Sequence, residues 1–98
     1  MITSARLGLD TMVVRDEDVV AQRVRDETVM VSLKTNRFYA LNAIGTEIWA
    51  MLERPMSMAD LCADLREAFD VASETCIREV SDLIEDMRRE ELVRIVGS

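Results

Sequence analysis

The chain has 98 residues, of which 49% are apolar, so it has room for one folded domain and is not a disordered chain. Its formal net charge of −7 is concentrated in residues 43–98, which hold thirteen Asp or Glu and six Arg. Such a surface repels phosphate, which argues against nucleic acid and anionic membranes as partners. The lack of histidine and the presence of only two cysteines argue against a mixed zinc site and a Ser-His or Cys-His enzyme, so we expect no cofactor.

We expect a single domain over residues 1–98, in which residues 1–11 form a loose arm because they show no periodic pattern. The first ten residues contain no apolar segment of the kind found in secretion signals. No apolar run approaches the 18 residues that a membrane-spanning helix needs. These features together predict a cytoplasmic protein.

The pattern of residues 19–41 predicts three β-strands. Residues 19–24 are rich in β-branched side chains, and residues 28–33 place three apolar side chains on one face at a period of two. A polar turn then leads to a third strand over residues 38–41. Because the connections are short, neighbouring strands are expected to be antiparallel. Residues 12–15 are expected to add a minor strand.

At Asn42 the period of the apolar residues changes to 3.6. The pattern predicts helices over residues 43–52, 58–69 and 74–90, followed by a short closing strand over residues 92–96. The expected N-terminal caps of these helices are Asn42, Ser57 and Ser73. The sequence therefore predicts an α+β, winged-helix-like fold, with a three-stranded antiparallel sheet followed by three helices.

Two other functional classes remain alternatives for this sequence. Winged-helix folds occur in transcription regulators, but residues 74–91 hold more than twice as many acidic as basic residues, which is unsuited to a DNA-reading helix. A small thiol redox protein is the other alternative. Cys62 and Cys76 both fall on apolar helix stripes, however, which predicts buried side chains of low reactivity.

The segment from Phe38 to Trp49, FYALNAIGTEIW, resembles the hallmark of the PqqD family: an aromatic pair, Leu-Asn, a small helix-start segment and Ile-Trp. Residues 79–87 resemble the last helix of that family, although Glu79 stands where Asp is commoner. The ending Leu-Val at residues 92–93 also matches, with Glu91 in place of the usual glycine. The resemblance covers about residues 19–96.

This resemblance implies a role in the biosynthesis of modified peptides. PqqD proteins are not enzymes, and they recognise the leader segment of a ribosomally made precursor peptide. They deliver it to a maturation enzyme, such as a protease, a cyclase or a radical enzyme. The resemblance therefore implies two partners for this chain, a precursor leader peptide and such an enzyme, in a pathway of lasso-peptide or PqqD type.

The resemblance also implies where the leader would lie, because the family's leader adds a strand beside the third strand and packs on the third helix. The expected edge consists of Arg37, Phe38, Tyr39, Ala40 and Leu41. Alternation places Phe38 and Ala40 on one face of the sheet, and the sequence does not say which face meets the peptide. The expected helix wall consists of Ile77, Ser81, Ile84 and Arg88, beside a core stripe of Cys76, Val80, Leu83 and Met87. The alternative is that Ile77 and Ile84 complete the core.

Overall fold

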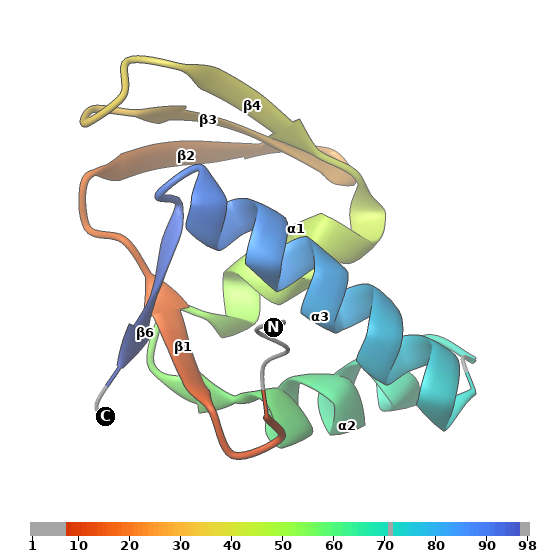
Figure 1. Cartoon of the computed structure of the whole chain (residues 1–98). Helices are drawn as coiled ribbons and strands as arrows, with labels where there is room; N and C mark the ends of the chain where they lie inside the picture. Colours follow the sequence, from red (N-terminus) through yellow and green to blue (C-terminus); the bar gives the residue numbers. More distant parts are fainter. Residues whose placement is uncertain (1–7, 71, 97–98) are drawn as a thin grey trace.

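The computed structural model describes residues 8–70 and 72–96, and its upper layer is an antiparallel meander (Figure 1). The strands β2 (Val19–Val24), β3 (Glu27–Ser32) and β4 (Phe38–Leu41) pair in the order β2-β3-β4. This arrangement confirms the predicted three-stranded sheet. Arg25 and Asn36 turn the chain between the strands in the left-handed backbone region, with φ angles of 59° and 62°.

Three helices follow the meander, as predicted: α1 (Ala43–Met51), α2 (Met58–Ala68) and α3 (Ser73–Arg89). The Asn42 and Ser57 side chains cap the first two by accepting bonds from the backbone N–H groups of Gly45 (2.9 Å) and Asp60 (3.0 Å). The prediction of Ser73 as the third cap is wrong. The extended residue at the cap position is Ala72, so α3 begins one residue earlier and Ser73 lies in its first turn.

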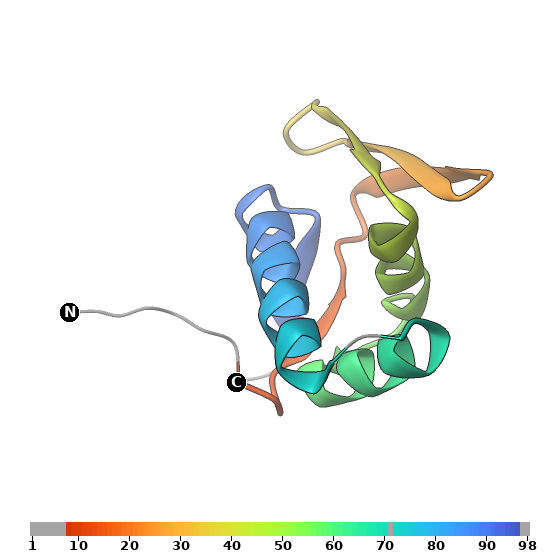
Figure 2. The same ribbon diagram turned by 90° about the vertical axis from the view of Figure 1, so that its right-hand side faces the viewer.

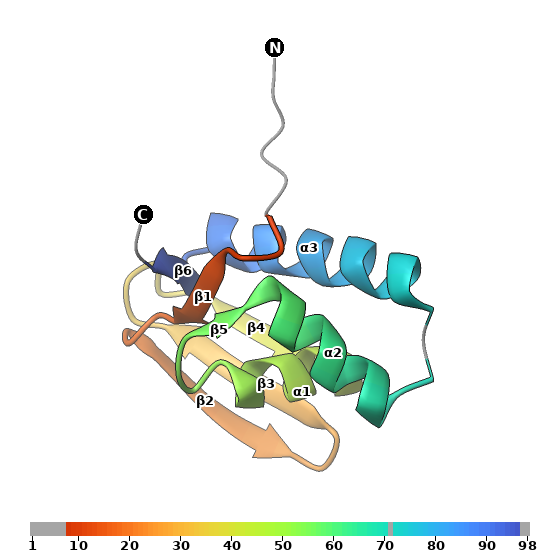
Figure 3. The same cartoon turned by 90° about the horizontal axis from the view of Figure 1, so that it is seen from below.

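A second small sheet, which the sequence did not predict as a unit, lies at one end of the molecule (Figure 3). In this sheet β1 (Met12–Arg15) is the central strand, between β5 (Met56–Ser57) and β6 (Val93–Val96). Both pairings are antiparallel. The expected minor strand and closing strand are therefore partners of each other, and β5 completes their sheet.

The core lies between the meander and the helices. Viewed from the side, α3 and α1 stand on opposite sides of the helical layer, with α1 below the meander, and α2 runs across the bottom (Figure 2). The largest fully buried side chains include Ile48, Leu52, Leu61 and Ile84. The face of the meander that points away from the helices stays open, and Val20, Val29 and Phe38 are exposed there.

The expected loose arm at residues 1–11 falls mainly on residues 1–7, which lie outside the described residues. The part next to them is held in place, because Leu9 and Thr11 accept backbone hydrogen bonds from Ala59 (2.9 Å) and Met58 (3.0 Å) at the start of α2. The prediction of a loose arm is therefore wrong for these two residues. Within the described ranges, no helix is long and apolar enough to cross a membrane.

Candidate functional site

The outer edge of β4 carries backbone groups that no other described strand pairs with. Among the described residues β4 pairs with β3 alone, and the Ser32 N–H donates to the Arg37 carbonyl at 2.9 Å. In an antiparallel pair, successive residues direct their backbone groups alternately toward and away from the partner strand. Tyr39 and Leu41 therefore bond to β3, whereas the N–H and C=O groups of Phe38 and Ala40 point outward. This edge is ready to pair with another strand.

The side chains of β4 also alternate, and the structure shows which of its two faces points toward the helices. Phe38, at 81% exposure, and Ala40 lie on the open face of the sheet. Tyr39 is half-buried and Leu41 is buried, on the side of the helices. A Cβ atom at Gly45 would lie 3.1 Å from the Leu41 Cβ, so glycine allows α1 to start directly beneath the end of β4.

Polar contacts join the beginning of β4 to the end of α3. The Tyr39 hydroxyl donates to the Glu90 carboxylate at 2.6 Å, and the Arg37 guanidinium lies 3.6 Å from the same carboxylate. The bond to Glu90 raises the pKa of Tyr39, because ionisation would place two negative charges side by side. These contacts fix the distance between the strand and the helix at one end of the site.

An apolar cavity of about 230 Å³ lies at the other end of the site, where β4 passes into α1. Asn42 follows β4 directly and lines this cavity together with Ile44 from α1. The opposite wall comes from α3, where Val80, half-buried Leu83 and the exposed Glu79 line it. We call the free edge of β4 together with this cavity the β4 groove.

Two of the four residues of the predicted helix wall are buried, which contradicts their place in that wall. Ile84 is 0% exposed and Ser81 is 3% exposed, so neither side chain can line an open groove. Ile77 is half-buried against the core, and Arg88 is exposed and paired with Glu85 at 2.8 Å. The reason is that α3 packs against β6 as well as α2, which buries a wider arc of the helix than its apolar stripe indicates.

The open side of α3 is instead the flank of Leu83 and Glu79. Leu83 was expected to face the core, and it is the α3 residue on this flank that offers apolar surface to the groove. The signal that could have identified it is the neighbouring Glu79, because a charged residue four positions earlier marks the edge of the buried arc. The edge residues Arg37 to Leu41 lie on β4 and in the turn before it, and their contact with a peptide stays a prediction.

The thiols do not form a reactive site. Cys62 and Cys76 are both buried between α2 and α3, and the Cys76 Sγ lies 3.7 Å from the Cys62 carbonyl oxygen. Burial raises the pKa of Cys62 to about 11, so its thiolate form is scarce at neutral pH. Within the described part of the chain, no group of three His, Cys, Asp or Glu side chains is placed to hold a metal ion.

Comparison with known proteins assigns the family. The family model described as coenzyme PQQ synthesis protein D (PqqD) matches residues 27–93, and the chain therefore belongs to the PqqD family. The solved structure described as TbiB1 in complex with the TbiA(beta) leader peptide has the same fold, with a TM-score of 0.79. It is 24% identical in sequence, and the match covers 87% of this chain and 99% of that one. No curated protein matches the sequence.

Proposed function

We propose that this protein binds the leader segment of a ribosomally made precursor peptide in the β4 groove and presents it to a maturation enzyme. The observation that carries the proposal is the free edge of β4, which carries the outward backbone groups of Phe38 and Ala40 and leads at its C-terminal end to an apolar cavity. Strand addition supplies affinity through the backbone and specificity through alternate side chains. In this proposal the chain contributes binding and performs no reaction itself.

The geometry defines how a leader strand would be read. Residues of the leader opposite Phe38 and Ala40 would share their face of the sheet and point away from the helices. The residues between them would point toward α3, where Leu83 and the cavity offer apolar surface. We therefore expect the leader to carry apolar side chains at alternate positions, with one large side chain entering the cavity.

Two comparisons support this proposal. Membership of the PqqD family places the chain among proteins named for the synthesis of a coenzyme. The structure of TbiB1, which shares the fold, is that of a complex with a leader peptide. The maturation enzyme of the present chain would be a protease, a cyclase or a radical enzyme, in a pathway of lasso-peptide or PqqD type.

The proposal is tested by blocking the edge of β4 without breaking the sheet. The Ala40 N–H points outward, so Ala40→Pro removes a donor that only an added strand would use, and proline is tolerated at such edge positions. We expect fluorescence anisotropy with a labelled synthetic leader-like peptide to show binding weakened about tenfold or more.

The matched control is Ala21→Pro, which makes the same change on the opposite edge of the same sheet. The outward backbone groups of Ala21 follow from the pairing of β2 with β3, and this variant should keep the affinity for the leader within about twofold. Circular dichroism verifies that both variants are folded. Equal weakening by the two prolines, or wild-type affinity in Ala40→Pro, would place the leader elsewhere.

A further inference from the structure

The meander has a second free edge, on β2. Among the described residues β2 pairs with β3 alone, and the Leu33 N–H donates to the Asp18 carbonyl at 2.7 Å. The same alternation as on β4 therefore directs the backbone N–H and C=O groups of Val19, Ala21 and Arg23 outward. The edge of β2 thus offers six backbone groups along three residues to which no described strand is paired.

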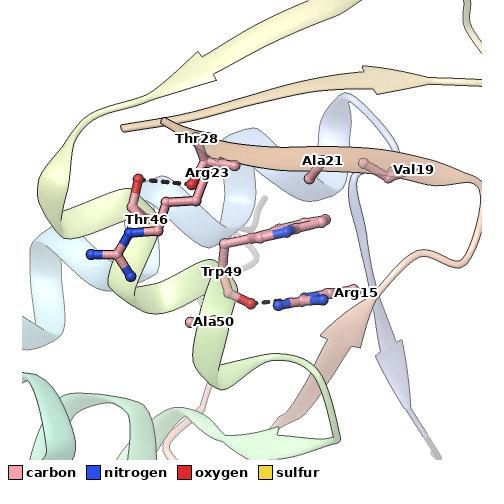
Figure 4. Close-up of a pocket in the computed structure, with 8 residues that line it drawn as sticks. All are labelled: Arg15, Val19, Ala21, Arg23, Thr28, Thr46, Trp49 and Ala50. Atoms are coloured by element: carbon pink, nitrogen blue, oxygen red, sulfur yellow. Dashed lines mark hydrogen bonds between the residues drawn. The ribbon is translucent and has the colours of Figure 1, made fainter. Parts of the chain in front are cut away.

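Beneath this edge lies a cavity of about 350 Å³ between β2 and α1 (Figure 4). The three residues with outward backbone groups, Val19, Ala21 and Arg23, also line the cavity with their side chains. The small side chain of Ala21 leaves space at the middle of the strand. An added strand would therefore meet the open backbone groups and the cavity together, since residues paired with these three would direct their side chains to the same face.

A fixed guanidinium group forms the far wall of this cavity (Figure 4). The Arg15 Nε donates to the Trp49 carbonyl at 2.8 Å, and the guanidinium carbon lies 4.9 Å from the centre of the Trp49 ring. Among the described residues, the two terminal nitrogens of Arg15 have no hydrogen-bond partner. A guanidinium held in place by one nitrogen and an aromatic face is preorganised to accept a carboxylate with the other two nitrogens.

The local charge is opposite in sign to that of the whole chain. The residues that line the cavity include two arginines, Arg15 and Arg23, and no carboxylate. The Arg23 guanidinium forms an ion pair with the partly exposed Glu47 carboxylate at 3.5 Å, so one carboxylate lies near two guanidinium groups. In a protein with a net charge of −7, this site therefore favours an acidic ligand.

We propose that the β2 edge is a second strand-addition site, which binds an extended acidic segment of a partner protein and places one of its carboxylates on Arg15. A side chain opposite Ala21 enters the cavity, and its carboxylate reaches the free nitrogens of Arg15. The site is independent of leader binding, because the two edges lie on opposite sides of β3. A sheet with both edges occupied would hold a leader on β4 and a partner on β2 simultaneously.

The test uses a nonapeptide of alternating Thr and Glu, blocked at both ends, and the same peptide with Gln in place of Glu. Both are titrated into the ¹⁵N-labelled full chain at 50 mM salt, and amide shifts are followed by NMR. We expect the Glu peptide to shift the amides of Val19, Ala21 and Arg23 and to bind at least fivefold more tightly than the Gln peptide. Equal affinity for the two peptides, or shifts confined to β4, would overturn the proposal.

Three variants and the leader complete the experiment. Arg15→Gln should remove the preference for Glu over Gln, and Ala21→Pro should prevent binding of both peptides, whereas Ala40→Pro should leave it unchanged. If Arg15→Gln does not fold, the effect of Ala21→Pro alone decides whether the peptides bind at the edge of β2. A saturating leader should leave the affinity for the Glu peptide unchanged, and competition between them would overturn the second site while leaving the first intact. Failure of the leader to bind in the same samples would instead count against the proposed function.

Discussion

Asp16 holds the junction between the two sheets. Its carboxylate accepts hydrogen bonds from the Lys34 ammonium group (2.9 Å) and from the Asp18 N–H (2.9 Å), and its own N–H donates to the Leu92 carbonyl at 2.9 Å. The bond from Lys34 and that from Asp18 lower the pKa of Asp16, and burial opposes them only in part. One side chain therefore joins the end of β1, the start of β2 and the turn after β3.

We predict that Asp16→Asn lowers the free energy of unfolding at pH 7 by about 1 kcal/mol, because a buried charged acceptor is replaced by a neutral one. The folded-state pKa of Asp16 lies below the unfolded value of 3.8, so its contribution is present above pH 3.8 and is lost as the pH falls through the folded value. The midpoints of urea unfolding between pH 7 and pH 2.5 measure this pH-dependent contribution of Asp16 to stability. The wild-type protein should lose more stability than Asp16→Asn as the pH falls over that range. If the two plots of stability against pH run parallel, the Asp16 carboxylate does not make this contribution.

At the scale of single elements, α3 presents different flanks to the core and to the β4 groove. Leu83 is half-buried at the cavity, and its neighbour Ile84 is completely buried. Adjacent residues on a helix point about 100° apart, so one step in sequence separates a binding contact from a core contact.

We predict that Leu83→Ser weakens leader binding about tenfold with little loss of stability, because it removes an apolar contact at the rim of the groove. Ile84→Ala should instead lower the free energy of unfolding by about 2–5 kcal/mol, because it leaves a cavity in the core. Calorimetric titration with the leader, together with urea unfolding of both variants, separates the two effects. A stable Ile84→Ala variant with weakened leader binding would instead support the helix wall predicted from the sequence, in which Ile84 contacts the leader.

The contact between α2 and α3 gives a second prediction for an element. Cys62→Ala and Cys76→Ala should each cost about 1 kcal/mol of stability, because they remove buried sulfur atoms from this contact. Leader affinity of the folded variants should stay at the wild-type value, since a buried thiol takes no part in binding through the edge of β4. Loss of leader binding without loss of stability would indicate a functional thiol.

For the whole molecule, the uneven distribution of charge suggests how the maturation enzyme approaches. Residues 43–98 carry six Arg and thirteen Asp or Glu, and residues 1–42 are balanced at six of each. The helices therefore present the acidic side of the protein, and the carboxylates of Asp60, Asp64 and Glu67 on α2 are exposed. We propose that a basic surface of the enzyme docks there.

Binding of the enzyme to the leader complex should then weaken as salt is raised from 50 to 300 mM, because salt screens exposed charges. The double variant Asp64→Asn/Glu67→Gln should weaken enzyme binding and leave leader binding unchanged. The matched control Glu17→Gln/Asp26→Asn makes the same change of charge on the meander side. Surface plasmon resonance with the immobilised complex measures these affinities, and an interaction insensitive to salt would contradict electrostatic docking.

Local patterns in the sequence are sufficient to predict most of the elements of this protein. The change of apolar period at Asn42 separates the meander from the helices, and Asn42 and Ser57 cap two of those helices as predicted. The edge strand from Phe38 to Leu41 also follows from its own residues. These features depend on neighbours within a few positions along the chain, so that local sequence specifies them.

The second sheet and the open flank of α3 depend on contacts between distant segments. The strand β5 has two residues, Met56–Ser57, which is too short for any period to show, and it exists because β1 lies beside it. The burial of Ile84 and Ser81 depends on the elements that pack around α3, which include α2 and β6, and an apolar stripe does not reveal how many elements will cover a helix. The positions of both cavities follow from this packing, because each cavity is the space that elements far apart in sequence leave between them.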